Sequence, residues 1–544
     1  MSLHLLDLPA EVLLACLGHL PLGDILSLLA LHNRSLSTLI YEAPAIQFRM
    51  EQAAHAAVET PYGRGAAAPL FARRQALRDR EDRWRAFSPV DRWEVAVRDM
   101  GLYDVGEDCY ALAYNDDPQR ETGLFDRMEY MFLDDRGRWR APEDITLPVV
   151  DLCVVSERDL MVVVTFAASA DMCALAVHLR QLSTGAVQDG LPRKIDVTTV
   201  PERYGVPDIR VEAAGATLAL ACCFMNSDEL DGEHDKLHVV HWPSGHAIAA
   251  VPCEVPSFVF LQDTLILAPN PLAHTLDVLA VGAETASWVL AFRLPWLRVG
   301  QRIFWETFAC RGAPNPHSSP SLADDPRFSA VKTRTAFRPD PEQSLLVLMF
   351  ATGPTDQPTP EPARTVVVVD RAGLAQCFQR AYERADLSEG APLEEVPFEV
   401  WAPQAAVWLD ASGMGLSGYA ATGVGTRFAA LSGISEADPE SKHVRVLDFS
   451  AASVEHVRAQ LGERGANADT CIVSEHATVR LVKPDFDLPM HDAFADVLVS
   501  ALPYVDIVSR EAVDWESVHL SNACIIGEKG SVDGGRVLDI LHFG

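Results

Sequence analysis

The chain lacks the sequence features that would signal enzyme chemistry or membrane insertion. It contains no C-x-x-C pair, no G-x-S-x-G, no H-E-x-x-H and no Walker-type glycine loop. We therefore predict no catalytic residue, no metal site and no cofactor, and we do not expect an enzyme. No apolar run approaches the ~18–20 residues that a membrane-spanning helix needs, so membrane contact is not expected either.

Basic residues are also scarce. Lys and Arg number 45 against 76 Asp and Glu, and the net charge is −31. Nucleic acids and anionic membranes both require a basic surface, so this balance disfavours them as partners. Apolar residues make up 48% and charged residues 22% of the chain, an ordinary globular composition.

Cysteines show no disulfide-like pattern. There are 11, an odd number, and they are scattered singly apart from the adjacent Cys222 and Cys223. Near the N-terminus, Asp7 and Pro9 interrupt the candidate signal sequence, which also lacks a basic n-region. These features predict reduced thiols and a cytoplasmic or nuclear location, or both.

Leucine, in contrast, is abundant at the start of the chain, where the first forty residues contain fifteen. Apolar residues recur at helical spacing over three segments separated by breaks, and we expect Asp24 to cap the second helix and Ser35 the third. The stripes are Leu13, Leu17 and Leu20; Ile25, Leu28 and Leu29; and Leu36, Leu39 and Ile40. Three such short helices cannot bury all these leucines. Some must therefore face another surface, either of this chain or of a partner.

Residues 8–40, LPAEVLLACLGHLPLGDILSLLALHNRSLSTLI, resemble the F-box in their Leu-Pro-x-Glu start and Leu-rich helices. The resemblance implies a docking module for the Skp adaptor of cullin-based ubiquitin ligases. Many F-boxes end in Val-Cys-basic-x-Trp, whereas this sequence places Leu36 at the Trp position, which reduces the contact area. The alternative is an ordinary helical hairpin packed on its own chain. The adaptor contacts implied by the resemblance are Leu8, Pro9, Val12, Leu13, Leu28, Leu31 and Leu36.

The following segments resemble basidiomycete-type F-box proteins, in which two helices precede an all-β region. The matching stretches are residues 43–59, an Arg-rich helix over 70–87, and, later in the chain, EVWAP and TGVGTRFAAL. We predict an α+β multidomain chain: an F-box of three helices over 1–48, a helical linker over 49–89, and a large all-β domain over 90–544 that binds a target or partner.

Beyond residue 90 the hydrophobic period changes from 3.6 to 2, and short β-rich runs alternate with turns. The runs are WEVAV, MEYMFL, LMVVVTF, LALACCF, KLHVVHW, SLLVLMF, TVVVVD and VRVLDF. A strand–turn–strand pattern recurs with turn glycines at Gly137, Gly185, Gly245 and Gly373, and HVRVLDFSAASV is a candidate further copy. This loose repeat predicts a degenerate six- or seven-bladed β-propeller. A pair of β-sandwiches is the alternative.

Two motifs offer weaker candidate sites. GMGLSG (413–418) fits G-x-G-x-x-G, but strand and turn sequence follows it, whereas a dinucleotide site needs a helix. His234, His238, His241 and His246 lie close together, yet His238 and His241 would face opposite sides of a strand. We interpret the first as a loop and the second as surface histidines of a hairpin.

The sequence is compatible with three functions. The first is a substrate-recognition adaptor of a Skp–cullin–F-box ubiquitin ligase, with a Skp-type adaptor, and through it cullin, as partners and an unknown target protein on the β domain. The second is a Skp-binding scaffold without a role in degradation. The third is an enzyme with its site in the propeller channel.

Overall fold

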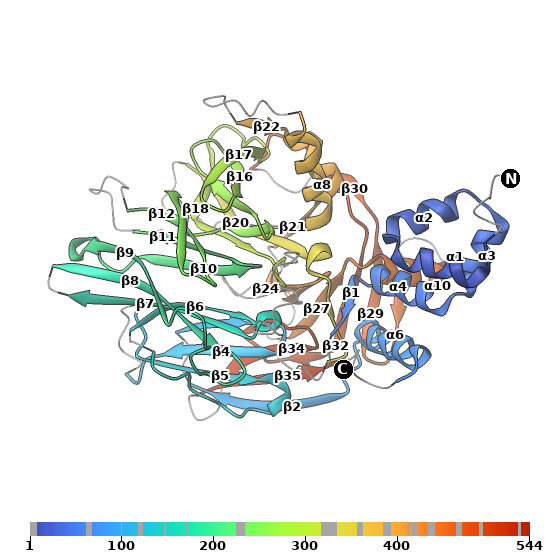
Figure 1. The fold of residues 1–544 in the computed structure, drawn as a ribbon, viewed down its shortest axis with the longest axis horizontal. Helices are drawn as coiled ribbons and strands as arrows, with labels where there is room; N and C mark the ends of the chain where they lie inside the picture. The colour runs from blue at the N-terminus through green and yellow to red at the C-terminus, as the bar shows by residue number, and fades with distance from the viewer. Residues whose placement is uncertain are drawn as a thin grey trace.

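The fold combines a helical head with a large β body (Figure 1). The computed structural model describes residues 8–60, 68–98, 101–117, 123–145, 148–169, 171–224, 234–316, 335–355, 363–384, 393–411, 414–415, 422–433, 441–463, 471–488, 493–530 and 535–544. Among the described helices, none is both long and apolar enough to cross a membrane.

The head consists of α1 (Ala10–His19), α2 (Leu22–Ala30), α3 (Arg34–Glu42) and α4 (Pro44–Ala54). The predicted helix caps were wrong, because Asp24 lies in the first turn of α2 and Ser35 lies inside α3. Prolines precede α1 and α2, and the Asn33 side chain caps α3 by accepting a hydrogen bond from the Leu36 amide at 3.1 Å. Asn33, and not Ser35, caps α3 because the carbonyl oxygen of its side chain reaches the third amide of the helix.

The head has its own apolar core. Ile25 and Ile40 are fully buried, and Leu17, Ala43 and Ile46 join them. The last two residues lie beside and within α4, so the core needs a fourth helix as well as the three predicted from the leucine stripes. Helix α4 also runs through residue 48, where the sequence suggested a boundary.

The segment after the head contains a strand as well as a helix. Strand β1 (Ala57–Glu59) pairs antiparallel with β19 (Phe337–Pro339), and α6 (Leu70–Ala86) follows. On α6, Leu77 and Trp84 are buried, as their spacing on the Arg-rich helix suggests. The linker is therefore part of the packed structure.

The first half of the body forms antiparallel sheets that follow one another along the chain. The β3–β5 sheet contains β3 (Leu102–Val105), β4 (Cys109–Tyr114) and β5 (Arg127–Phe132). The β6–β9 sheet contains β6 (Val149–Val155), β7 (Leu160–Ser169), β8 (Met172–Gln181) and β9 (Lys194–Pro201). The β10–β13 sheet contains β10 (Asp208–Ala214), β11 (Thr217–Cys223), β12 (Lys236–His241) and β13 (His246–Pro252).

Two further sheets occupy the middle of the chain. The β14–β17 sheet contains β14 (Val259–Gln262), β15 (Leu265–Asn270), β16 (Thr275–Val281) and β17 (Ala286–Arg293), and β22 (Glu394–Val396) is added parallel to β17. The β18–β23 sheet contains β18 (Gln301–Arg311), β20 (Leu345–Pro354), β21 (Ala363–Asp370) and β23 (Ala406–Asp410).

The last part of the body is more elaborate. The β24–β32 sheet contains β24 (Met414–Gly415), β25 (Gly423–Val424), β26 (Arg427–Ser432), β27 (Lys442–Asp448), β28 (Ile472–Val473), β29 (Ala477–Val482) and β32 (Tyr504–Val513). A two-stranded ribbon, β30 (Asp485–Leu488) and β31 (Leu498–Ser500), extends from it. The β33–β35 sheet contains β33 (Ser517–Leu520), β34 (Cys524–Gly530) and β35 (Arg536–His542).

The end of the chain pairs with its beginning. Strand β2 (Asp91–Val97) pairs antiparallel with β35 over its full length and completes the β33–β35 sheet with a strand more than four hundred residues away in sequence. The chain ends in strand β35, and the strand assignment of all eight β-rich runs is confirmed. The body is mostly β and β-propeller-like, with its sheets spread around a common centre (Figure 1), rather than a pair of β-sandwiches.

Two of the predicted strand–turn–strand units were wrong. Asp370 caps α8 (Arg371–Tyr382) by accepting from the Gly373 amide at 3.0 Å, so Gly373 lies in a helix. HVRVLDFSAASV likewise continues from β27 into α10 (Ala451–Glu463). Turn glycines at Gly185 and Gly245 are confirmed, with φ of 74° and 72°, values that favour glycine.

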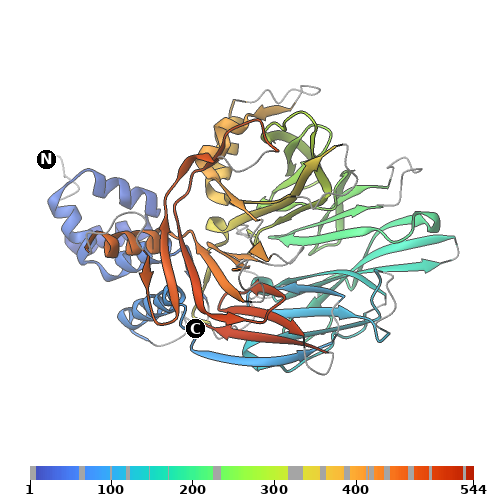
Figure 2. The same cartoon turned by 180° about the vertical axis from the view of Figure 1, so that it is seen from behind.

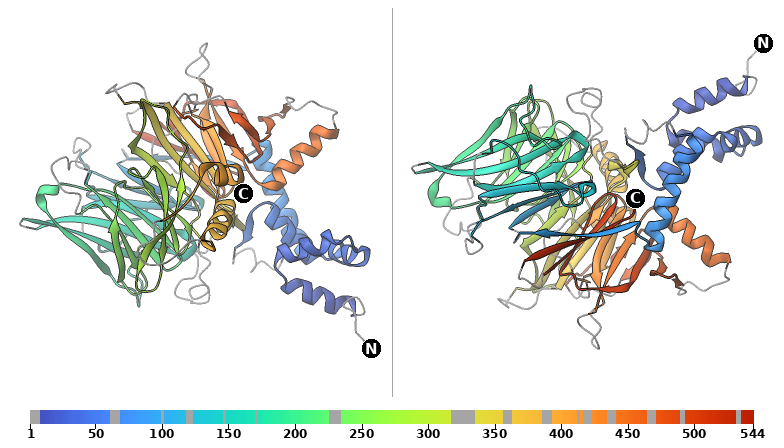
Figure 3. Two further views of the ribbon diagram at one scale, coloured as in Figure 1. Left: turned by 90° about the horizontal axis from the view of Figure 1, so that it is seen from above. Right: turned by 90° about the horizontal axis from the view of Figure 1, so that it is seen from below.

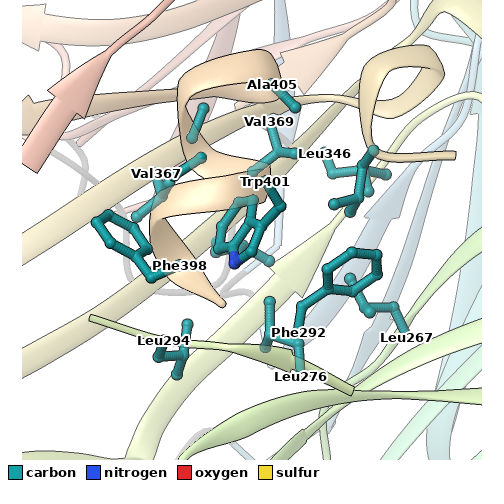
Figure 4. Packing of buried hydrophobic residues seen from close by; sticks show 14 of the residues in the cluster. Leu267, Leu276, Phe292, Leu294, Leu346, Val367, Val369, Phe398, Trp401 and Ala405 are labelled. Atoms are coloured by element: carbon teal, nitrogen blue, oxygen red, sulfur yellow. The ribbon is translucent and has the colours of Figure 1, made fainter. Parts of the chain in front are cut away.

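Apolar side chains fill the spaces between neighbouring sheets. Figure 4 shows one such core, where Trp401 on α9 (Phe398–Ala405) packs with Phe292 and Phe398 between the β14–β17 and β18–β23 sheets. The Trp401 indole donates to the Arg293 carbonyl at 2.8 Å, which satisfies its buried N–H. The head lies to one side of the sheets of the body, beside α10, and α6 contacts β29 (Figures 2 and 3).

Candidate docking surface on the head and its attachment to the body

The head keeps a set of large apolar side chains in solvent. Among the residues implied by the F-box resemblance, Val12 and Leu31 are exposed, Leu31 to 69%. Pro9, which precedes α1, is exposed as well. Sequence reasoning missed Leu26 and Tyr41, which are exposed to a similar degree. Helical spacing could have identified Leu26, because it lies off the α2 stripe that faces the core. We call Pro9, Val12, Leu26, Leu31 and Tyr41 the head surface.

The other implied contact residues are less accessible. Leu8 and Leu28 are half-buried, and Leu28 packs against the head core. Leu13 and Leu36 are buried inside the chain. In this conformation Leu13 and Leu36 stabilise the head itself, and direct contact with a partner is left to the exposed and half-buried residues.

An arginine of the fourth helix fixes the first helix in place. The Arg49 guanidinium donates to the carbonyls of Gly18 and Leu20 at 2.9 and 2.8 Å, at the C-terminal end of α1. Those carbonyls have no partner within the helix, so a cation there also interacts favourably with the helix dipole. These bonds hold α1, which carries Val12 of the head surface, in a fixed position relative to α4.

Helix α6 attaches the head to the body through an aromatic stack. Trp84 is 1% exposed, and its ring lies 4.1 Å from that of Phe543 at an interplanar angle of 17°. Arg427 covers Trp84, with its guanidinium carbon 4.6 Å from the ring centroid. The Trp84 side chain is thus held between two segments of the body.

Buried charges surround this stack. Arg427 forms ion pairs with Glu81 of α6 and with Asp448 of β27, and Arg80 donates to the Asn522 carbonyl at 2.9 Å. Burial would raise the pKa of Asp448, but Arg427 and the hydrogen bonds from Ser450 and Ser453 hold it below its usual value. Removing one partner of such a network leaves a buried charge unpaired and costs several kcal/mol.

The inner strands of the body converge on a small cavity lined by carboxyl groups. The cavity of about 50 Å³ is bordered by Asp104, Glu107, Glu157 and Glu212, together with Arg311. Arg311 lies 3.6 Å from Asp104 and 3.3 Å from Glu212. A volume of this size holds only a few water molecules, whereas substrate pockets usually measure about 300–1,000 Å³. No spacing signal pointed to this group of acids, because the segments that carry them, around residues 104–107, 157 and 212, are far apart in sequence.

We expect these acids to make stability depend on pH. Burial, with the neighbouring charges of Glu157 and Asp108, raises the pKa of Glu107 from 4.5 to about 8. Between these values the folded chain keeps a proton that the unfolded chain releases, so stability falls as pH rises through this window. Glu107→Gln removes this contribution and should flatten the decline in unfolding temperature between about pH 5 and 8. Exposed Glu306→Gln serves as the control, and identical pH profiles for both variants would contradict the prediction.

The motifs considered from sequence do not assemble into a site among the described residues. His238 is buried in β12, and burial lowers its pKa to about 4. His241 pairs with Ser244 at 2.8 Å, and exposed His246 lies 3.8 Å from Glu284. Within the described ranges, no group of three or more His, Cys, Asp or Glu could hold a metal ion. Most of GMGLSG lies outside the described residues.

No protein-family model matches the sequence, and no curated protein matches it. Similar solved structures include the β-propeller domain of Cps50 (Swd1) from Myceliophteria thermophila, at 9% identity over 83% of this chain and 98% of that one, with a TM-score of 0.35. The WD40 domain of SCAP from fission yeast is 9% identical over 84% and 95%, with a TM-score of 0.33. BamB from Moraxella catarrhalis is 10% identical over 84% and 99%, with a TM-score of 0.31.

These sequence identities and TM-scores are too low to indicate what this chain does. The sheets themselves define the class to which the chain belongs, a β-propeller-like body that carries a helical head.

Proposed function

We propose that the chain is a substrate-recognition adaptor of a Skp–cullin–F-box type ubiquitin ligase. The observation that carries the proposal is the head surface, where four large apolar side chains stay exposed on helices whose core is already filled. Large apolar side chains that stay in solvent together on one small helical unit are typical of interaction sites. In this proposal the head binds a Skp-type subunit, the body binds a target protein, and the partner subunits perform the chemistry.

The attachment of the head supports an adaptor role. An adaptor must hold its target at a defined distance from the catalytic subunits, so head and body need a fixed relation. The β1–β19 pairing, the Trp84 stack and the Arg427 ion pairs link the two parts through buried contacts. A flexible tether would need none of them.

We infer that the body is a closed ring of seven blades. Apolar clusters lie between successive sheets from β3–β5 to β33–β35. One more cluster joins Val95 and Ile540 of the last sheet to Tyr110 and Met131 of the first. Each sheet thus has a neighbour on both faces, as the blades of a propeller do.

The chain's cysteines support a cytoplasmic or nuclear location. All 11 are free, and all but Cys16 and Cys471 are buried. Disulfides are rare in reducing compartments, where a set of unpaired buried thiols of this kind is ordinary.

The decisive experiment mixes the purified full chain with a Skp-type adaptor and follows complex formation by size-exclusion chromatography. We expect a stable complex of one copy of each. Ubiquitin transfer to a captured target, in the presence of the cullin and its conjugating enzyme, then separates a degradation adaptor from a scaffold. Absence of any complex would overturn the assignment.

The enzyme alternative depends on the carboxyl-lined cavity. The size of the cavity argues against a substrate site, since it accommodates only a few water molecules. Its groups also hold the structure together: Asn315 donates to Glu212 at 2.7 Å, and Asp104 accepts from the Val154 amide at 2.9 Å. We assign the cavity a structural role.

A further inference from the structure

A second exposed apolar surface lies on the body, far from the head. We call it the rim patch and define it by Leu272, Trp296, Val299 and Val497. These side chains are 85%, 52%, 105% and 57% exposed. They come from three separate segments, the β15–β16 turn, the β17–β18 loop and the segment before β31. Large apolar side chains that gather in solvent mark an interaction site more strongly than scattered ones do.

Hydrogen bonds between the three segments keep the rim patch rigid. His274 contacts the Pro295 carbonyl at 2.9 Å, which joins the β15–β16 turn to the β17–β18 loop. The Trp296 amide donates to Asp496 at 2.6 Å, and the Ala495 amide donates to the Trp296 carbonyl at 2.7 Å. A surface fixed in advance loses little entropy on binding.

The rim patch carries exposed arginines in a chain that is acidic as a whole, while Arg293 is paired with Glu395 and Asp496 adds one carboxylate to the patch. Arg298 and Arg302 are exposed on either side of Val299. Arg302 has no carboxylate partner among the described residues, and its guanidinium carbon lies 4.4 Å from the Phe304 ring centroid. Arg293 lies over Trp296 at 4.9 Å. Tryptophan and arginine dominate the binding energy of many protein interfaces, and this arrangement brings them together.

Strand β18 separates the rim patch from the face to which the linker is attached. It begins at Gln301, next to Val299, and ends at Arg311 in the carboxyl-lined cavity. Eleven residues of extended chain span roughly 30 Å. The linker joins the cavity side through β1 and β19, because Asn522 contacts both Arg80 and the Phe337 carbonyl there. A partner on the rim patch would therefore not collide with the linker.

We propose that the rim patch is the target-binding surface and that it takes a peptide segment combining aliphatic or aromatic side chains with carboxylates. The apolar side chains of the peptide cover Trp296, Val299 and Leu272, and its carboxylates pair with Arg302. The proposal rests on the proposed function, since it names the place and chemistry of that target. An anionic membrane is the weaker match, because the net charge of −31 repels it.

The test uses the immobilised full chain without any adaptor and a random-peptide phage library. We expect the enriched peptides to combine apolar residues with Asp or Glu. Labelled versions should bind at least about tenfold more weakly to Val299→Asp and to Arg302→Glu. Val473→Asp, a change at an exposed residue of β28, is the matched control and should bind as the wild type does. Unfolding temperatures of all variants should agree, because every changed residue is exposed.

Several results would overturn the proposal. In the peptide experiment they are a failure to enrich any peptide, enriched peptides without acidic residues, and equal binding to wild type and Val299→Asp. Binding to phosphatidylserine vesicles in place of peptides would also overturn it. So would a dimer of the chain that Val299→Asp dissociates. A Skp-type adaptor added to the same samples reports separately on the head. Adaptor binding without peptide binding would refute the rim patch alone, and the reverse would refute the proposed function of the head.

Discussion

If the head binds a Skp-type adaptor as proposed, we expect that replacing both Val12 and Leu31 with aspartate abolishes its capture, with an affinity loss of at least about a hundredfold. Both side chains are exposed in the free chain, Leu31 to 69%, and a partner that covers the head surface must bury them. Two carboxylates buried in an apolar interface lose their hydration and find no cation among the head-surface residues. The measurement is titration of the purified variant with the adaptor by calorimetry.

The control for this experiment is Val473→Asp, which places the same charge on an exposed valine of the body. It should capture the adaptor as the wild type does. Both variants should unfold at the wild-type temperature, because neither change reaches a core. Normal affinity of the Val12→Asp, Leu31→Asp variant would mean that the adaptor does not cover the head surface. The proposed function would then lose its main support.

Changes at Leu13 and Leu36 should behave differently, although the F-box resemblance implies them as contacts too. Both are buried inside the chain, so truncation to alanine creates a cavity and costs about 2–5 kcal/mol of stability. Any loss of adaptor binding should then follow unfolding of the head and disappear at low temperature. The exposed fraction of the side chain, which the sequence alone does not give, distinguishes Val12 and Leu31 from Leu13 and Leu36.

Most strands of the body could be predicted because they are short, nearly continuous apolar runs bounded by turns, and many of them are buried on both faces between neighbouring sheets. The errors at Gly373 and at HVRVLDFSAASV have a common cause. Asp and Ser can begin either a turn or a helix, and short-range chemistry does not decide between them. Here the side chain of Asp370 reaches the Gly373 amide and starts α8. Beyond the turn, Leu374, Cys377, Phe378 and Ala381 recur at helical spacing and are buried, so the wider pattern favours the helix that the short turn motif did not.

The sites could be predicted only in part. The excess of leucine over what short helices can bury pointed to the N-terminal helices as an interaction unit. The leucine stripes themselves face the head core, however, and the head surface lies off them. The rim patch could not be predicted from the sequence, because Leu272, Trp296 and Val497 lie on segments that only the folded chain brings together. The network of Arg427 with Glu81 and Asp448 was invisible for the same reason, although the spacing of Leu77 and Trp84 marked the buried face of α6.

Truncation of Trp84 to alanine should cost about 3–5 kcal/mol of stability, the largest effect that we expect from a single substitution in the linker. The change removes the stack on Phe543 and uncovers Arg427, whose ion pairs with Glu81 and Asp448 depend on exclusion of water. Urea unfolding measures the loss. Limited trypsin digestion should also cut α6 faster, because its arginines become accessible when the helix leaves the body.

Phe71→Ala is the matched control, since Phe71 lies on the same helix and is 77% exposed. It should change stability by no more than about 0.5 kcal/mol. The head core does not include Trp84, so the Trp84→Ala chain should still capture the Skp-type adaptor. Ubiquitin transfer to a bound target should nevertheless fall, because the target is no longer held at a fixed distance from the catalytic subunits. Undiminished transfer together with rapid cleavage of α6 would show that the rigid attachment has no part in function.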